Sequence, residues 1–290
     1  MSSSSPVQNR IINDPELVAR LQRGDTWMLQ LLIRRFQESI FVISLGISLD
    51  PRAAHVLMRD VLVHSYSAIR RLKADVSLAP WLRRMAVRYG TGLRWRPWYK
   101  RFWWFYTASD TVPPDICQVL NALRPRDRAI FVLKSAQNLS VDEVAAVLGV
   151  PVEVIQIHLS NIWLQMIRVL ETLAGSKQGI PGSTCGRGRW FTYGDDGQDP
   201  EENAAMKAHL AECEECRRQM ETMASFLQGF RKWIEIETHA VDFKCIEKTV
   251  VLEAIYQPRD RRGWLRPVLT LLIPLLMLAG IVAAGVFFLM

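Results

Sequence analysis

The residues of this chain best suited to chemistry are a histidine and two cysteines near residue 210. His209, Cys213 and Cys216 follow one another at H-x3-C-x2-C spacing. On a helix His209 and Cys213 share one face and Cys216 lies about one turn further, so the three side chains can converge on a soft metal ion. The alternative is three incidental residues on a surface helix, and this spacing favours the metal.

The cysteine content of the whole chain supports the metal interpretation. The chain has 5 cysteines, three of them near a histidine, which is typical of metal binding rather than of disulfides. Cys185 precedes His209 and is the natural fourth ligand. Four protein ligands leave no open coordination position, so we expect a Zn²⁺ site that is structural or redox-sensing rather than catalytic. We expect the isolated Cys117 and Cys245 to be ordinary buried thiols.

A second candidate site is a helix-turn-helix between Leu123 and Leu170. Ser140 and Glu143 form the capping box that begins a short helix, and Gly149 can take the left-handed backbone that ends it. Pro151 suits the first turn of the next helix. The buried stripes of the two helices are expected at Val144, Val147, Leu148, Val152, Ile155 and Leu159.

The second helix of this motif is the one that would enter the DNA major groove. Its exposed face carries no Lys or Arg, and the Lys and Arg residues between positions 122 and 172 are balanced by Asp and Glu. Phosphate neutralisation supplies much of the affinity of proteins for DNA, so this segment brings little of that affinity. The candidate base-reading residues are Gln156, His158 and Asn161. A plain helical hairpin without a DNA role is the alternative.

Length and composition indicate several small helical domains. The 290 residues are 49% hydrophobic, which is enough for two or three small domains. No stretch before residue 260 alternates like a strand, so the chain is predicted to be all-α. The net charge is +7 and is concentrated in the N-terminal third. That placement suits nucleic acid, an acidic enzyme surface or anionic lipid.

The N-terminal part is predicted to be a helical bundle after a disordered lead-in. Asp14 opens the first helical run, with a break at Gly24-Asp25, and Asp50-Pro51 starts the next helix. Residues 73–80 are expected to form a loop, and a third helix is expected to start at Trp81. The candidate DNA-binding residues on the outer side of that helix are Arg83, Arg84 and Arg88.

A family resemblance is carried by three N-terminal segments: PELVARLQRGDTWMLQLLIRRF, DPRAAHVLMRDVLVHSYSAI and SLAPWLRRMAV. Together with the helix-turn-helix, they resemble the extracytoplasmic-function (ECF) sigma factors of the sigma-70 family. The resemblance implies a first domain that grips the clamp helices of core RNA polymerase and melts promoter DNA. It implies a second domain that reads the more distant promoter element. The implied polymerase-binding positions are Arg59, Asp60 and Tyr66.

The chain departs from the family pattern at several of these positions. Where the family carries an acidic cluster, this chain has Ala53, Ala54, His55 and Val56. Arg59-Asp60 stands in place of a Gln-Glu pair, and Tyr66 in place of a Trp. On the reading helix, Gln156, Ile157 and His158 replace basic residues.

The segment around the metal-binding residues carries a second resemblance. Tyr193, Asp196-Gly197, Asp199-Pro200-Glu201, His209, Cys213 and Cys216 stand where the zinc-binding anti-sigma domains have them. The resemblance implies a small helical domain that folds around zinc, inserts between two sigma domains and blocks their contact with polymerase. Thiolate oxidation with loss of zinc is the type of switch known in some members of that family.

Two further stretches concern the membrane. Residues 94–106 interleave aromatic rings with Arg and Lys, which suits a membrane interface, rings packed between domains, or single-stranded DNA. Residues 267–290 carry no charge and are long enough to cross a bilayer once. The cations that precede them are Arg259, Arg261, Arg262 and Arg266. The positive-inside rule therefore predicts residues 1–266 in the cytoplasm, at the bacterial inner membrane. We expect neither an N-terminal signal peptide nor an external domain after Met290.

The predicted layout has seven parts. They are a lead-in (1–13), a first helical bundle (14–93), an aromatic and basic linker (94–119), a helix-turn-helix domain (120–172), a zinc domain (173–222), a helical juxtamembrane segment (223–266) and a transmembrane helix (267–290).

Two hypotheses follow from this layout. The first is a membrane-tethered ECF-type transcription initiation factor that binds RNA polymerase and promoter DNA and is regulated in cis by its zinc domain. The alternative is a degenerate sigma-like protein that binds another regulator at the membrane without recognising promoters. We find no nucleophile–base pair, phosphate loop or open metal site, so an enzyme is not expected.

Overall fold

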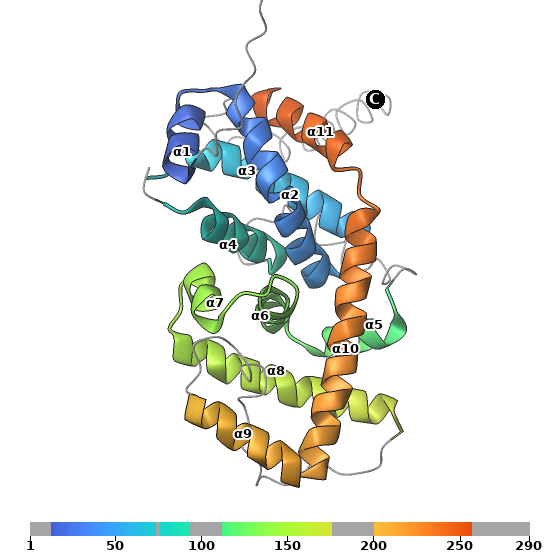
Figure 1. Cartoon of the computed structure of the whole chain (residues 1–290). Coiled ribbons are helices and arrows are strands. Elements are labelled where there is room, and N and C mark those ends of the chain that lie inside the picture. Colours follow the sequence, from blue (N-terminus) through green and yellow to red (C-terminus); the bar gives the residue numbers. More distant parts are fainter. Residues whose placement is uncertain (1–12, 74–75, 93–111, 176–199, 257–290) are drawn as a thin grey trace, which may run out of the picture. The chain divides into compact units, whose positions relative to one another are not determined.

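The computed structural model describes residues 13–73, 76–92, 112–175 and 200–256, and these residues form helices and connecting turns without a strand (Figure 1). The predicted all-α fold is therefore confirmed for this part of the chain. The chain divides into two compact units, Met1–Val251 and Leu252–Met290, and every contact described below lies within the first.

The first bundle contains α1 (Asp14–Gln22), α2 (Thr26–Ser48), α3 (Pro51–Ile69) and α4 (Leu78–Gly90). The predicted starts of its first helices are confirmed, because the side chains of Asn13, Asp25 and Asp50 cap α1, α2 and α3. The long helix α2 packs against α1, α3 and α4. Its buried residues, among them Phe41, supply much of the core of this bundle.

Helix α4 begins three residues before the predicted start at Trp81. The backbone amide of Leu78 donates to the carboxylate of Asp14 over 2.8 Å, which satisfies an amide at the start of the helix. Pro80 lies in the first turn, where its missing N–H is not needed. The predicted loop over residues 73–80 is therefore shorter than expected.

The second bundle contains α5 (Pro114–Ala122), α6 (Pro125–Ser135), α7 (Val141–Leu148) and α8 (Val152–Leu173). Helix α5 starts inside the predicted linker 94–119, because Pro114 suits a first helical position and Ile116, Val119 and Leu120 form a buried face.

The helix-turn-helix is formed by α7 and α8 as predicted. The Ser140–Glu143 capping box is present, and Gly149 ends α7 with a φ of 69°. Pro151 differs from the prediction, since its ψ of 151° makes it the extended residue before α8 rather than part of its first turn. Val144, Val147, Ile155 and Leu159 are buried, whereas Leu148 and Val152 are partly exposed.

The C-terminal helices are α9 (Pro200–Glu212), α10 (Glu214–His239) and α11 (Phe243–Tyr256). Helix α10 runs without a break across residues 222 and 223, where a boundary between the zinc domain and a juxtamembrane segment was predicted. After His239 the chain turns, and the carboxylate of Asp242 accepts from the amides of Lys244 and Cys245 to begin α11. Helix α10 contacts α2, α5, α8 and α9 (Figure 1).

The predicted transmembrane helix 267–290, the aromatic run 94–106 and Cys185 lie outside the described residues. Among the residues that are described, no single helix is long and apolar enough to cross a membrane. The pair α7 and α8 meets the length and composition requirement only when the two are taken together, across a bend of 108°.

Candidate metal centre and its contacts with the helical bundles

The predicted metal-binding residues converge in the structure. One ligand atom from each of His209, Cys213 and Cys216 lies within 4.8 Å of the others. Cys216 is buried, and His209 and Cys213 are partly buried. Two thiols and an imidazole are among the ligands that Zn²⁺ prefers, and atoms this close together can bind one ion. The three residues therefore fit a zinc ion, with a fourth ligand to be supplied from outside the set.

The convergence arises where two helices meet rather than along one helix. His209 lies in the last turn of α9 and Cys216 in the first turn of α10, with Cys213 as the residue between them. The amide of Cys213 donates to the carbonyl of His209 over 2.8 Å, which keeps the two side chains on one side of the turn. The side chain of Cys213 makes no capping hydrogen bond to α10, and its thiol lies in the cluster with His209 and Cys216.

The two isolated cysteines differ from each other. Cys117 is partly buried and its sulfur accepts from Nδ2 of Asn121 over 3.2 Å. Cys245 is exposed on α11, so the prediction that it is a buried thiol was wrong. Its position on the helix faces away from the side that carries the buried Glu247 and Val250.

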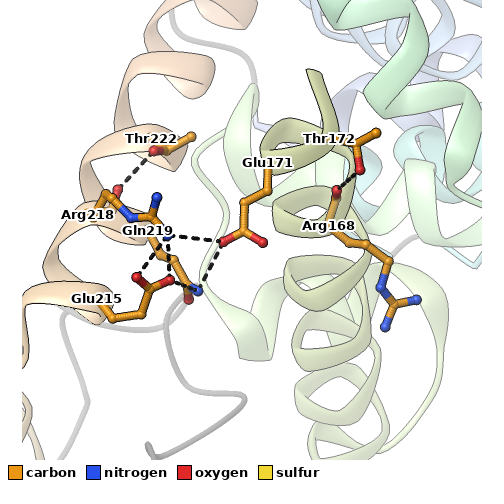
Figure 2. A network of polar contacts seen from close by, with 7 residues as sticks. All are labelled: Arg168, Glu171, Thr172, Glu215, Arg218, Gln219 and Thr222. Carbon is orange, nitrogen blue, oxygen red and sulfur yellow. Dashed lines mark hydrogen bonds and ion pairs between the residues drawn. The ribbon is translucent and has the colours of Figure 1, made fainter. Parts of the chain in front are cut away.

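A polar network joins the start of α10 to the end of α8 (Figure 2). Arg218 contacts both carboxylate oxygens of Glu215, at 2.7 and 2.8 Å. Nε2 of Gln219 donates to Glu215 over 3.0 Å and to Glu171 of α8 over 3.3 Å. Arg218 also lies 3.9 Å from Glu171, whose side chain is only 15% exposed. These carboxylates keep the pKa of Arg218 above its usual value, with Glu215 as the main cause.

Further along α10, aromatic side chains pack against α6 of the second bundle. The ring of Phe230 lies 5.1 Å from that of Phe131, and Phe226 and Trp233 adjoin the pair. All four rings are buried. Nε of Arg231 donates to the carbonyl of Ser135 at the end of α6 over 3.0 Å. Burial of this much aromatic surface makes the central part of α10 a docking surface rather than an exposed connection.

Helix α11 packs back on the first bundle. Glu247, with a side chain only 9% exposed, pairs with Arg34 of α2 at 2.8 Å. That carboxylate raises the pKa of Arg34. The ring of Phe243 meets Phe41 edge to face at 6.0 Å, and Phe41 meets His55 of α3 in the same manner at 5.1 Å. Burial lowers the pKa of His55.

The two bundles also contact each other directly. Arg128 of α6 donates to the carbonyl of Ile47 in α2 over 2.9 Å, and burial lowers the pKa of this arginine to about 10. A Cβ atom added to Gly46 would overlap the side chain of Val132, so α2 and α6 lie too close together at this point for a larger residue to fit without a shift. Arg84 of α4 donates to the carbonyls of Ala146 and Val147 at the end of α7.

The predicted DNA-binding residues have different surroundings. Gln156, Asn161 and Arg88 are exposed. Nδ1 of His158 lies 2.6 Å from the buried carboxylate of Asp127 in α6. Arg83 is half-buried, and desolvation lowers its pKa. His158 and Arg84 therefore make contacts within the protein, and these contacts would have to break before the two side chains could bind DNA.

The predicted polymerase-binding residues lie together on α3. Arg59 and Asp60 form an ion pair at 3.4 Å. Tyr66 is buried, with the guanidinium of Arg70 lying 5.9 Å from the centre of its ring. Of these three residues, Arg59 and Asp60 are partly exposed, whereas Tyr66 is buried.

Sequence reasoning missed the residues of α10 and α11 that contact the bundles. The signal was present, because Met223, Phe226, Phe230 and Trp233 recur at helical spacing. That stripe indicates a helix docked on another surface, whereas this segment was predicted as a helix leading to the membrane. Glu171 and Arg34 carried no such signal, since single charged residues on a helix are common.

Comparison with known proteins gives two family matches. Residues 116–162 match the family described as "Sigma-70, region 4", and residues 190–217 match the family described as "Putative zinc-finger". The first match covers most of α5, all of α6 and α7 and half of α8, and the second ends just after Cys216.

Two individual proteins are similar to parts of the chain. The RNA polymerase sigma-H factor of Pseudomonas aeruginosa is 28% identical over 74 residues, which are 26% of this chain and 38% of that protein. The chain therefore matches less than half the length of this relative. The structure of CnrH in complex with the cytosolic domain of CnrY aligns with 57% of this chain and 99% of that one, at 19% identity and a TM-score of 0.43. Two parts of the chain are therefore similar to known families: residues 116–162 to sigma-70 region 4, and residues 190–217 to a putative zinc finger.

Proposed function

We propose that the chain is an ECF-type transcription initiation factor that its own zinc domain holds inactive. The observation that carries this proposal is that α10, the helix that follows the metal-binding residues, contacts α2 of the first bundle and α5 and α8 of the second. One element therefore touches both of the bundles that polymerase and promoter DNA would need.

Several contacts hold α10 and α11 against the two bundles of the same chain. The buried aromatic cluster around Phe230, the Arg231–Ser135 contact and the Arg34–Glu247 pair together tie the C-terminal helices to both bundles. Since the partner surfaces lie in the same chain, docking needs no second protein, and its effective concentration is set by the connecting segments. The proposed regulation is therefore in cis.

In this proposal the factor is tethered at the bacterial inner membrane. The support is the uncharged segment 267–290, preceded by four arginines, which together fit a single-pass helix with residues 1–266 in the cytoplasm. Zn²⁺ would be held by His209, Cys213, Cys216 and Cys185. Its chemistry there is to fix the junction of α9 and α10, since a structural zinc site contributes folding free energy.

A transcription assay tests this function. The full chain and its Phe230→Ala variant are each added to core RNA polymerase with a pool of genomic fragments, and the 5′ ends of the transcripts are sequenced. We expect transcripts with a shared upstream sequence from the variant and fewer from the wild type, because loss of the Phe230 ring weakens the packing of α10 on the two bundles. Ile236→Ala, which removes an exposed residue of the same helix, should behave as the wild type. Absence of transcripts from every form would exclude an initiation factor.

A second candidate function is favoured by the surface of α8. Ile157 is 62% exposed, and the exposed residues next to it on α8, which are Glu153, Gln156 and Asn161, carry no positive charge. His158 and Arg84 make contacts within the protein. These features favour a sigma-like adaptor that binds another regulator rather than promoter DNA. In the same assay the adaptor would give no transcript, even where the opened variant binds polymerase.

A further inference from the structure

Glu215 occupies a special place in the metal site, because it lies between two of the ligands. The sequence Cys213-Glu-Glu-Cys216 forms the chelate loop, and α10 begins within it at Glu214. For Cys213 and Cys216 to bind one ion, the first turn of α10 must be formed and correctly oriented. Whatever fixes Glu215 therefore fixes the loop that carries both thiols.

The contacts that fix Glu215 end on another domain. Arg218 and Gln219 stand one turn after Glu215 on the same face of α10, and both contact its carboxylate. Both also reach Glu171 near the end of α8, at 3.9 Å and 3.3 Å (Figure 2). Arg218 thus lies between two carboxylates, one in the chelate loop and one in the second bundle.

The burial of Glu171 makes this contact more than an exposed ion pair. Its side chain is 15% exposed, against 37% for Glu215 and 41% for Arg218. Partly buried charges are screened less by water and salt than exposed ones. Removing the Glu171 carboxylate would remove the contact of Arg218 and Gln219 with the second bundle. Their contacts with Glu215 would stay, but these lie within α10 and are of the weak kind found along exposed helices.

We propose that Glu171 is a positioning residue of the metal site: through Arg218 and Gln219 it holds the loop between Cys213 and Cys216 and raises the affinity of the site for Zn²⁺. The inference rests on the proposed zinc site and adds to it a residue from the helix-turn-helix domain. By thermodynamic reciprocity, zinc binding must then strengthen the contact between α8 and α10 by the same factor.

The size of the effect follows from comparable contacts. Residues that hydrogen-bond directly to metal ligands change metal affinity by about 10- to 100-fold when mutated. Glu171 acts one contact further away, so its removal is expected to weaken zinc binding by about 5- to 20-fold, within the usual range of coupling between sites.

Zinc titration of the full chain tests the proposal. The purified chain is stripped of metal under reducing conditions and titrated with Zn²⁺ against a chromophoric chelator, for the wild type, Glu171→Ala, Glu171→Gln and Glu153→Ala. We expect weaker binding for Glu171→Ala and intermediate binding for Glu171→Gln, whose amide oxygen still accepts from Gln219 but carries no charge for Arg218. Glu153→Ala, an exposed acid of the same helix, should bind as the wild type.

A second readout separates coupling from general damage. Hydrogen exchange at the end of α8 should slow on zinc binding in the wild type and not in Glu171→Ala. If Glu171→Ala has lost helix content even with zinc, the zinc affinity of Gln219→Leu is measured instead, because this variant keeps Glu171 and every ligand. Weaker zinc binding by Gln219→Leu supports the proposal, and unchanged binding overturns it. Equal affinities for the wild type and a folded Glu171→Ala also overturn it. A wild type that binds no zinc removes the proposed metal site itself, and this inference with it.

Discussion

Nε of Arg84 in α4 donates to the carbonyl oxygen of Val147 in α7 over 2.6 Å. The same guanidinium reaches the carbonyl of Ala146, so a cation of the first bundle satisfies the open carbonyls at the end of a helix in the second bundle. The turn of the helix-turn-helix is therefore held by α4, and an arginine predicted to bind DNA serves as a contact between bundles.

Replacing Arg84 with methionine tests this contact. Methionine keeps most of the apolar stem but leaves two carbonyl groups without their charged donor. We expect the free energy of unfolding to fall by about 1–3 kcal/mol, measured by urea denaturation. Arg88→Met removes an exposed arginine of the same helix and should change stability by less than about 0.5 kcal/mol. Equal effects of the two substitutions would show that the Arg84 contact contributes nothing.

Gly46 provides a test of the close approach between α2 and α6. An added Cβ would overlap the side chain of Val132, so Gly46→Ala is expected to cost about 1–3 kcal/mol through overpacking. Gly229→Ala is the matched control, because a Cβ there meets nothing within 4 Å. That change should stabilise α10 by about 0.5–1 kcal/mol.

The double variant Gly46→Ala with Val132→Ala completes this test. Removing the two methyl groups of Val132 makes room for the new Cβ. The double variant should therefore lose less stability than the sum of the losses in the two single variants. Thermal unfolding of the four forms gives the coupling energy. Additive losses would mean that α2 and α6 do not meet at these two residues.

Local signals in the sequence predicted most of the fold. The capping residues Asp25, Asp50 and Ser140 stand directly before helices that form as expected, because caps act on amides within one turn. The candidate metal ligands could also be predicted from the sequence, since His209, Cys213 and Cys216 lie within eight residues of one another. Local spacing is enough to bring such residues together.

Contacts between distant segments could not be predicted in this way. Nothing near Glu171 in the sequence indicates Arg218, and nothing near Arg34 indicates Glu247, since such pairs depend on how whole helices pack. Pro114 lies inside the predicted linker 94–119, although proline suits the first position of a helix and α5 begins there. A boundary was predicted after residue 222, whereas α10 continues without a break to His239.

His55 predicts a dependence of stability on pH. Burial lowers the pKa of His55 in the folded protein, whereas in the unfolded chain its pKa is about 6.5. Below that pH the unfolded state binds more protons than the folded state, so stability falls as pH falls. Urea midpoints at pH 7.5 and 5.5 should separate more for the wild type than for His55→Asn. A parallel decrease in both would assign the pH dependence to other groups.

Loss of a metal ligand should have a local effect. We expect the reduced wild type to co-purify with one equivalent of zinc, and Cys213→Ala to lack it and to unfold α9 and the first turn of α10. Hydrogen exchange should accelerate there while the core of α2 around Phe41 keeps its protection. Ala211→Ser, which changes an exposed residue between the ligands, serves as the control. Full zinc content in Cys213→Ala would contradict the assigned ligand set.

The affinity of core RNA polymerase for the full chain tests the central claim, that α10 keeps the two bundles from their partner, most directly. Phe230→Ala and Ile236→Ala are compared with the wild type under identical zinc and salt conditions. If docking holds the wild type mainly in a closed state, the apparent dissociation constant of Phe230→Ala should fall by on the order of tenfold or more, with Ile236→Ala unchanged. Equal binding of polymerase by the wild type and Phe230→Ala would contradict the account.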